Sequence, residues 1–97
     1  MLDKDFEWDD QKSETNKARH GIDFEEARNL WRQGVDEYPS PRGKEMRYVA
    51  FGKLNDKLYL VALTYKGHRR RLISAREATA EEQERYEAQK KAQKGRN

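Results

Sequence analysis

The sequence predicts an α+β fold in which two N-terminal helices pack on a small, mainly antiparallel sheet and a further helix closes the chain. Three observations predict it. Residues 9–34 contain no proline and hold two segments with helix-capping patterns. Three strand-like stretches follow between residues 46 and 75, separated by short turns. Finally, 97 residues suffice for one small domain with one core.

The first elements read as a short strand and a polar helix. Residues 5–8 include two aromatic side chains, Phe6 and Trp8, and we interpret this segment as a brief edge strand or an N-terminal anchor. A helix then begins after Asp9 or Asp10 and runs to His20, where Gly21 ends it as a residue that tolerates positive φ. This helix has almost no apolar face, so its neighbours must hold it in place.

A second helix is predicted from Asp23 to Gly34. Asp23 and Glu26 form a capping-box pattern at its start. Its core stripe consists of apolar residues at helical spacing: Phe24, Ala27, Leu30 and Trp31. Residues 39–44 hold two prolines and a glycine and are predicted to form a loop.

The predicted strands are residues 46–53, 58–65 and 69–75. The middle stretch is apolar at both alternating positions, which is typical of a central strand covered on both faces. Thr79 and Glu82 form a second capping-box pattern and open a terminal helix. We therefore expect a single domain over residues 1–86 and a charged tail, residues 87–97, that frays.

Charge is unevenly spread along the chain, although the net charge is only +3. Residues 1–40 hold 6 basic and 11 acidic side chains, whereas residues 41–97 hold 15 basic and 7 acidic ones. The absence of cysteine excludes disulfides, thiolate nucleophiles and Cys-based zinc sites. No apolar run approaches the length of a membrane span and no signal peptide is visible, so we expect a cytoplasmic protein without a membrane partner.

The stretch from Lys66 to Arg76 points to a polyanionic partner. It holds five Lys or Arg residues, one histidine and no acid, and it reads as a turn followed by a strand. Cationic side chains on a rigid strand can hold a phosphate backbone, which makes RNA the first partner to consider. Two histidines and scattered acids do not form a metal-site pattern, and no cofactor is expected.

Helix one offers candidate site residues on one face. Lys12, Asn16 and His20 follow one another at intervals of four residues, with Arg19 beside them. These side chains can contact RNA, and an imidazole can transfer protons near neutral pH. The alternative is a solvated face whose His20 and Arg19 complement the helix dipole.

The strands offer a second group of candidates. Arg47 opens the first strand, Arg71 and Arg76 bracket the last, and Arg69 is the first residue of that strand. On ideal alternation, one face of the last strand carries Arg70, Leu72, Ser74 and Arg76, and the other carries Arg71, Ile73 and Ala75. Tyr65 and Ser74 are hydroxyl groups near strand ends that can bind phosphate or stack a base. Each arginine is also compatible with a surface charge or an ion pair with the acidic helices, and each hydroxyl with a plain strand role.

In order along the chain, the motifs resemble those of the BrnT toxin family. They are Phe6-Glu7-Trp8-Asp9, Lys12, Asn16, Arg19-His20-Gly21, Phe24-Glu25-Glu26-Ala27, Arg47-Tyr48, Gly52 and Leu72-Ile73-Ser74-Ala75-Arg76. The resemblance implies a RelE-like fold and a type II toxin–antitoxin toxin that slows growth by metal-independent endoribonuclease activity. It also implies a cognate antitoxin with a ribbon-helix-helix DNA-binding part, and contact with operator DNA only through that antitoxin.

Transferred by position, the implied basic site comprises Lys12, His20, Arg47 and Arg76, with Ser74 nearby. We expect His20, Arg47, Arg76 and Tyr65 to be catalytic, and Lys12, Arg19, Arg69, Arg71 and Ser74 to bind RNA. We further expect the two strand arginines Arg47 and Arg76 to meet His20 at one hollow. The alternatives are a non-catalytic nucleic-acid-binding or partner-binding module that uses the same basic face, and an interaction subunit.

Overall fold

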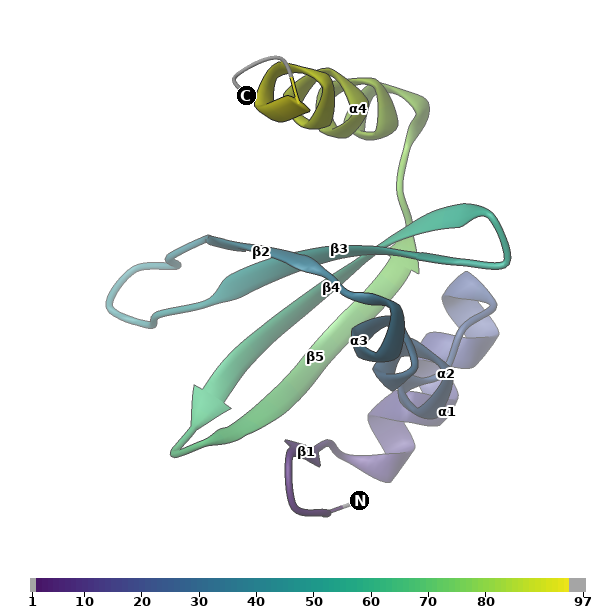
Figure 1. The fold of residues 1–97 in the computed structure, drawn as a ribbon. Helices are drawn as coiled ribbons and strands as arrows, with labels where there is room; N and C mark the ends of the chain where they lie inside the picture. Colours follow the sequence, from purple (N-terminus) through teal and green to yellow (C-terminus); the bar gives the residue numbers. More distant parts are fainter. Residues whose placement is uncertain (1, 95–97) are drawn as a thin grey trace.

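A computed structural model describes residues 2–94 as a five-stranded sheet with helices on both sides (Figure 1). The helices are α1 (Asp10–His20), α2 (Phe24–Arg28), α3 (Leu30–Gln33) and α4 (Ala80–Lys94). The strands are β1 (Phe6–Glu7), β2 (Asp36–Pro39), β3 (Tyr48–Leu54), β4 (Lys57–Lys66) and β5 (Arg69–Glu77). The strand order is β1-β5-β4-β3-β2, and every pairing is antiparallel except that of β1 with β5. The α+β prediction is confirmed, and β4 is the central strand as expected.

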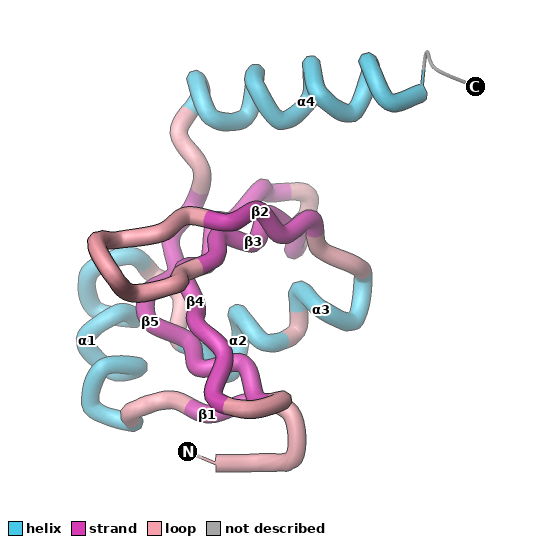
Figure 2. Tube along the Cα trace, turned by 90° about the vertical axis from the view of Figure 1, so that its left-hand side faces the viewer, coloured by secondary structure: helices cyan, strands magenta, loops and turns pink. Residues whose placement is uncertain are grey.

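The core lies between the sheet and α1–α3. Phe24, Leu30, Val61 and Leu63 are fully buried there. Gly52 lets β3 approach α3 closely, because a Cβ at this position would come within 3.2 Å of the Leu30 Cβ. Helix α4 lies on the opposite side of the sheet from α1–α3 in both views (Figures 1 and 2). We call the sheet face turned away from α1–α3 the outer face.

Local capping fixes α1 and α2 as predicted. The Asp9 side chain accepts hydrogen bonds from the first turn of α1, and Gly21 ends the helix at φ 77°. Asp23 and Glu26 form the expected capping box at the start of α2. The helix predicted over residues 23–34 is instead interrupted at Asn29, whose N–H bonds to Glu26 one residue short of the α-helical partner. Two short helices therefore replace one.

Strand β2 was not predicted, because its last residue, Pro39, belongs to a segment that reads as a loop. Its position explains why a proline is acceptable: β2 is an edge strand, and Pro39 pairs with Tyr48 at its end. The terminal helix α4 extends to Lys94 and so includes the first residues of the predicted tail, residues 87–94. Lys90 forms an ion pair with Asp36 at 3.0 Å that supports this second half. Residues 95–97 of the predicted tail lie outside the described part.

Among residues 2–94, no helix is both long and apolar enough to cross a membrane.

Candidate active site

Strand register directs a row of polar side chains onto the outer face. Tyr48, Leu63 and Leu72 pair across β3, β4 and β5 and lie on the core side of the sheet. Because successive side chains point to opposite faces, their neighbours in the chain project outward. These neighbours are Arg47, Thr64 and Arg71.

A β-bulge brings Ser74 and Arg76 onto the same face. Leu63 pairs with Leu72 and Ala62 with Ser74, so Ile73 is an extra residue in β5. Ideal alternation predicted that Arg70, Leu72, Ser74 and Arg76 would share a face, and this is wrong for the last two. The buried residues Leu72 and Ala75 are three positions apart, so Ser74 and Arg76 lie with Arg71 on the outer face.

Each arginine of the outer face contacts a carboxylate. Both terminal nitrogens of Arg76 bond to Glu82 at the start of α4, at 2.7 and 2.8 Å. Arg71 donates to Glu7 of β1 at 2.6 Å, and the Nε atom of Arg47 lies 3.3 Å from Glu45. The hydrogen bonds from Arg76 lower the pKa of Glu82 to about 2, so this carboxylate is ionised at neutral pH. The guanidinium groups are thus oriented and partly neutralised.

A hollow of about 210 Å³ lies where α1 runs beside β5. We call it the α1 hollow. Its lining is Lys12, Thr15, Asn16, Arg19, His20, Ile73 and Ser74. The structure therefore brings four predicted site residues together: Lys12, Arg19, His20 and Ser74. Arg47, Tyr65 and Arg76 are not among the described residues that line it.

Ser74 joins the α1 hollow to the outer face. It lines the hollow and lies two residues from Arg76 on the same side of β5, which corresponds to roughly 7 Å along a strand. The expectation that Arg47, Arg76 and His20 meet at one hollow is therefore replaced by a different arrangement. The two arginines lie on one sheet face, and the imidazole lies at the border of that face.

Asn16 connects α1 to β5 at the border between the α1 hollow and the outer face. Its side-chain amide donates to the carbonyls of Ile22 and Ala75, each at 2.7 Å, and its oxygen accepts from the Ala75 N–H at 3.2 Å. The amide thus pairs with the Ala75 backbone as a neighbouring strand would. Sequence spacing placed Asn16 on the same face as Lys12 and His20, and its burial shows that it positions α1 against β5.

Within residues 2–94, the side chains of Lys12, Arg19 and His20 form no hydrogen bond or ion pair with another side chain, and all three residues are exposed. Arg19 and His20 also lie in the last turn of α1, where the helix dipole favours positive charge. The α1 hollow therefore offers exposed cations beside a serine hydroxyl, a combination that can receive an anion such as a phosphate.

Tyr65 and Arg69 lie apart from this arrangement. Tyr65 is two residues from Leu63 on β4 and so projects from the core side, where its hydroxyl bonds to Glu37 at 2.8 Å. Burial and this hydrogen bond raise the pKa of Tyr65, so its hydroxyl is protonated at neutral pH. Arg69 donates from Nε to the Asp3 carbonyl at 2.9 Å. The structure separates both residues from His20.

Sequence reasoning allowed for ion pairs between these arginines and the acidic helices but did not identify which carboxylates form them. Glu82 was recognised only as part of a capping box, and it does accept from the Thr79 N–H at 2.9 Å. The same carboxylate also accepts hydrogen bonds from Arg76, and no local pattern in the sequence indicates this second contact. No group of three or more His, Cys, Asp or Glu side chains suited to a metal ion is found in the described chain.

Comparisons with known proteins agree with this architecture. The family described as "Ribonuclease toxin, BrnT, of type II toxin-antitoxin system" matches residues 8–82. The crystal structure of the Brucella abortus ribonuclease toxin BrnT is similar, with a TM-score of 0.61 and 26% sequence identity, over 79% of this chain and 99% of that one. A search of curated proteins found no match.

Proposed function

This chain belongs to the BrnT family of ribonuclease toxins of type II toxin–antitoxin systems, and we propose that it is an endoribonuclease that needs no metal ion. Its target is RNA, its effect is slower growth, and a cognate antitoxin with a ribbon-helix-helix DNA-binding part neutralises it. One observation supports the choice of these residues as the active site. Ser74 belongs both to the α1 hollow, with its exposed cations, and to the outer face that holds Arg76.

The proposed reaction is transfer within the RNA itself. A base removes the proton of a 2′-hydroxyl, the 2′-oxygen attacks the neighbouring phosphorus, and an acid protonates the departing 5′-oxygen. Cations stabilise the extra negative charge on the phosphorane. We assign proton transfer to His20 and charge stabilisation to Arg76 and Arg47.

Lys12, Arg19 and Ser74 hold the phosphate at the α1 hollow in this proposal. Arg71 extends the contact along β5, and Arg69 adds to it at the start of the strand. Because Tyr65 lies on the core side and is protonated, it serves as a hydrogen-bond donor to RNA at most. The carboxylates Glu7, Glu45 and Glu82 orient the arginines in the free enzyme and give way to phosphate oxygens when RNA binds.

The test is incubation of the purified, antitoxin-free protein with RNA in EDTA. Cleavage should persist, His20→Ala should lower the rate about 100-fold, and Lys12→Met should weaken RNA binding. Lys57→Met, at the exposed first residue of β4, where a long contact of 3.9 Å to Glu77 is lost, is the matched control for loss of one positive charge. Intact RNA with a folded sample would contradict catalysis, whereas salt-sensitive binding without product would favour a non-catalytic binding module.

The antitoxin proposal has its own test. The product of a neighbouring gene should co-purify with this chain and abolish cleavage, and the pair, but not the toxin alone, should bind operator DNA. Operator binding by the isolated chain would contradict this division of roles.

A further inference from the structure

Arg70, which the outer face does not use, lies among aromatic rings on the core side of the sheet. Its guanidinium carbon is 5.6 Å from the centroid of the Phe6 ring, 5.9 Å from that of Trp31 and 5.8 Å from that of Tyr65. No carboxylate in residues 2–94 forms an ion pair with it. Arg70 thus differs from Arg71 and Arg76, which bind Glu7 and Glu82.

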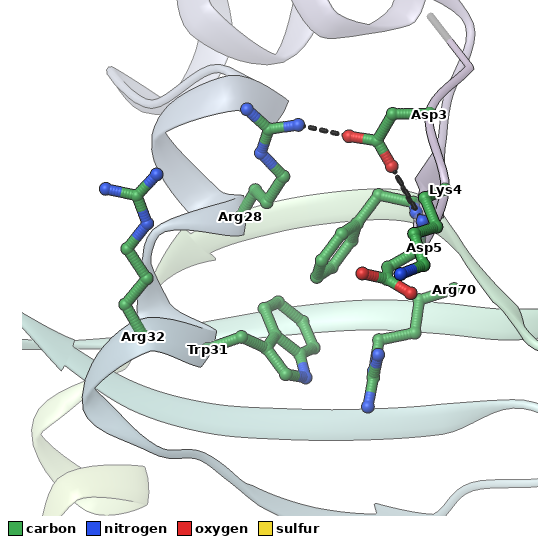
Figure 3. Close-up of a pocket in the computed structure, with 8 residues that line it drawn as sticks. Asp3, Lys4, Asp5, Arg28, Trp31, Arg32 and Arg70 are labelled. Atoms are coloured by element: carbon green, nitrogen blue, oxygen red, sulfur yellow. Dashed lines mark hydrogen bonds and ion pairs between the residues drawn. The ribbon is translucent and has the colours of Figure 1, made fainter.

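Two buried donors in this cluster have no acceptor. The Trp31 Nε1 atom and the Arg70 Nε atom are both buried without a hydrogen-bond partner among the described residues. Figure 3 shows the indole nitrogen on the side of Trp31 that faces the Arg70 guanidinium. An unpaired buried donor is unfavourable, so rotation of these side chains toward an acceptor oxygen would give both donors a partner.

The same residues line a cavity of about 620 Å³ with a cationic rim. Lys4, Arg28 and Arg32 lie around it, and Asp3 and Asp5 supply the opposite charge (Figure 3). Asp3 is already engaged, since it forms an ion pair with Arg28. The cavity therefore combines ring faces, donors without acceptors and an excess of positive charge.

We propose that this cavity is a second RNA-binding site, which takes one nucleotide that flanks the cleaved bond. The nucleobase stacks on Trp31, which is partly exposed, whereas Phe6 is only 8% exposed and supports the indole from the core. The phosphate oxygen of the nucleotide accepts from the Trp31 and Arg70 donors. The inference rests on the proposed ribonuclease function. Arg70 and Ser74 lie four residues apart on opposite faces of β5, which is on the order of 10 Å along the strand. An RNA strand that contacts both sites therefore passes around the edge of the sheet beside β5, where β1 covers only Arg70 and Arg71.

Trp31 supplies a direct probe. Trp8 is only 4% exposed, so a Trp8→Phe variant, checked for folding by circular dichroism, leaves Trp31 as the sole indole. This variant is titrated with a 2′-O-methyl oligoribonucleotide, which has no free 2′-hydroxyl and cannot be cleaved. We expect saturable quenching of Trp31 fluorescence that weakens as salt is raised.

Substitution of Arg70 then tests the donor role. Arg70→Lys keeps the charge but loses the planar fork, and it should weaken oligonucleotide binding about tenfold. The matched control is Arg85→Lys on the exposed side of α4, where the side chain is 78% exposed and no change is expected. Trp31→Phe, followed by anisotropy of a labelled oligonucleotide, should weaken binding while it preserves a stacking ring.

Four outcomes would overturn the site. The first is oligonucleotide binding without a Trp31 response, and the second is an equal effect of Arg70→Lys and Arg85→Lys. The third is quenching by inorganic phosphate at the same concentration as the oligonucleotide. The fourth is stronger quenching by poly-glutamate, which would indicate an acidic protein partner. Cleavage of unmodified RNA in EDTA is measured in parallel. Cleavage without a Trp31 response defeats only this site, and a Trp31 response without cleavage defeats only the ribonuclease proposal.

Discussion

The arginines on the two faces of β5 are held in different ways. On the outer face, Arg71 and Arg76 bind the carboxylates of Glu7 and Glu82. On the core side, Arg70 lies on aromatic rings, and its Nε donor has no acceptor. An ion pair fixes a guanidinium and cancels its charge, whereas a ring fixes it and leaves the charge available. A single basic strand thus holds its guanidinium groups in two different electrostatic settings.

The largest effect is expected for substitution of Asn16, whose side chain connects α1 to β5, the strand that carries both groups of arginines. Asn16→Ala removes the amide that ties α1 to Ala75 and leaves backbone groups of Ile22 and Ala75 without partners. The free energy of unfolding should fall by about 3 kcal/mol, as measured by urea denaturation. Thr15→Ala, on the exposed side of the same helix, is the control. An equally stable Asn16 variant would show that β5 is held in place by other contacts.

Substitution of Arg76 and of Arg70 compares the catalytic contributions of the two faces directly. Arg76→Ala should lower kcat about 100-fold, because it removes charge stabilisation at the scissile phosphate. Arg70→Ala should act mainly on KM, because a flanking nucleotide contributes binding rather than chemistry. Steady-state kinetics on a defined RNA separates the two. If Arg70→Ala proves the more damaging to kcat, the assignment of the two faces is reversed.

The Arg76–Glu82 pair predicts a pH dependence of stability. The pKa of Glu82 is about 2 in the folded chain, below its usual value of 4.5, so the ionised carboxylate favours the folded state. This contribution is complete above about pH 5 and is lost as the pH falls toward 2. Because the Arg76 and Glu82 side chains are 38% and 27% exposed, we discount it to about 1–2 kcal/mol.

Glu82→Gln should therefore remove part of the acid sensitivity, as measured by thermal unfolding between pH 2 and 6. Glu84→Gln, an exposed neighbour on α4, is the control. An unchanged pH profile for Glu82→Gln would mean that the pair orients Arg76 without stabilising the fold.

The smallest effect is expected at Tyr65. Tyr65→Phe removes the hydroxyl that bonds to Glu37 but keeps the ring beside Arg70. We expect a loss of about 0.5–1 kcal/mol in unfolding free energy and a change in kcat within about threefold. A loss of activity comparable with that of His20→Ala would show that Tyr65 transfers a proton and would move the chemistry to the core side.

Local patterns in the sequence predicted the elements whose determinants are themselves local. The capping residues Asp9, Asp23 and Gly21 set the ends of α1 and α2 as expected. The apolar run of β4 marked the central strand. The bulge at Ile73 could not be predicted in this way, because it arises from the pairing of β5 with β4.

The sequence indicated which residues gather at the α1 hollow, but it did not indicate how the arginines are paired or on which face they lie. Lys12, Arg19, His20 and Ser74 do share one hollow. The partners of the arginines depend on contacts between distant segments, as when Glu7 of β1 meets Arg71 of β5. Sequence spacing within a helix or strand carries no information about such contacts. For the same reason Arg70 read as an ordinary surface charge, although the fold surrounds it with Phe6, Trp31 and Tyr65.

The Asn16 amide has a further consequence for solubility. Strand β1 covers β5 only at Arg70 and Arg71, so the Ala75 backbone would otherwise be open to pairing with another chain. By occupying both the N–H and the carbonyl of Ala75, Asn16 closes the place where intermolecular strand addition would begin. An Asn16 variant that still folds should therefore be more prone to aggregation than its stability alone suggests.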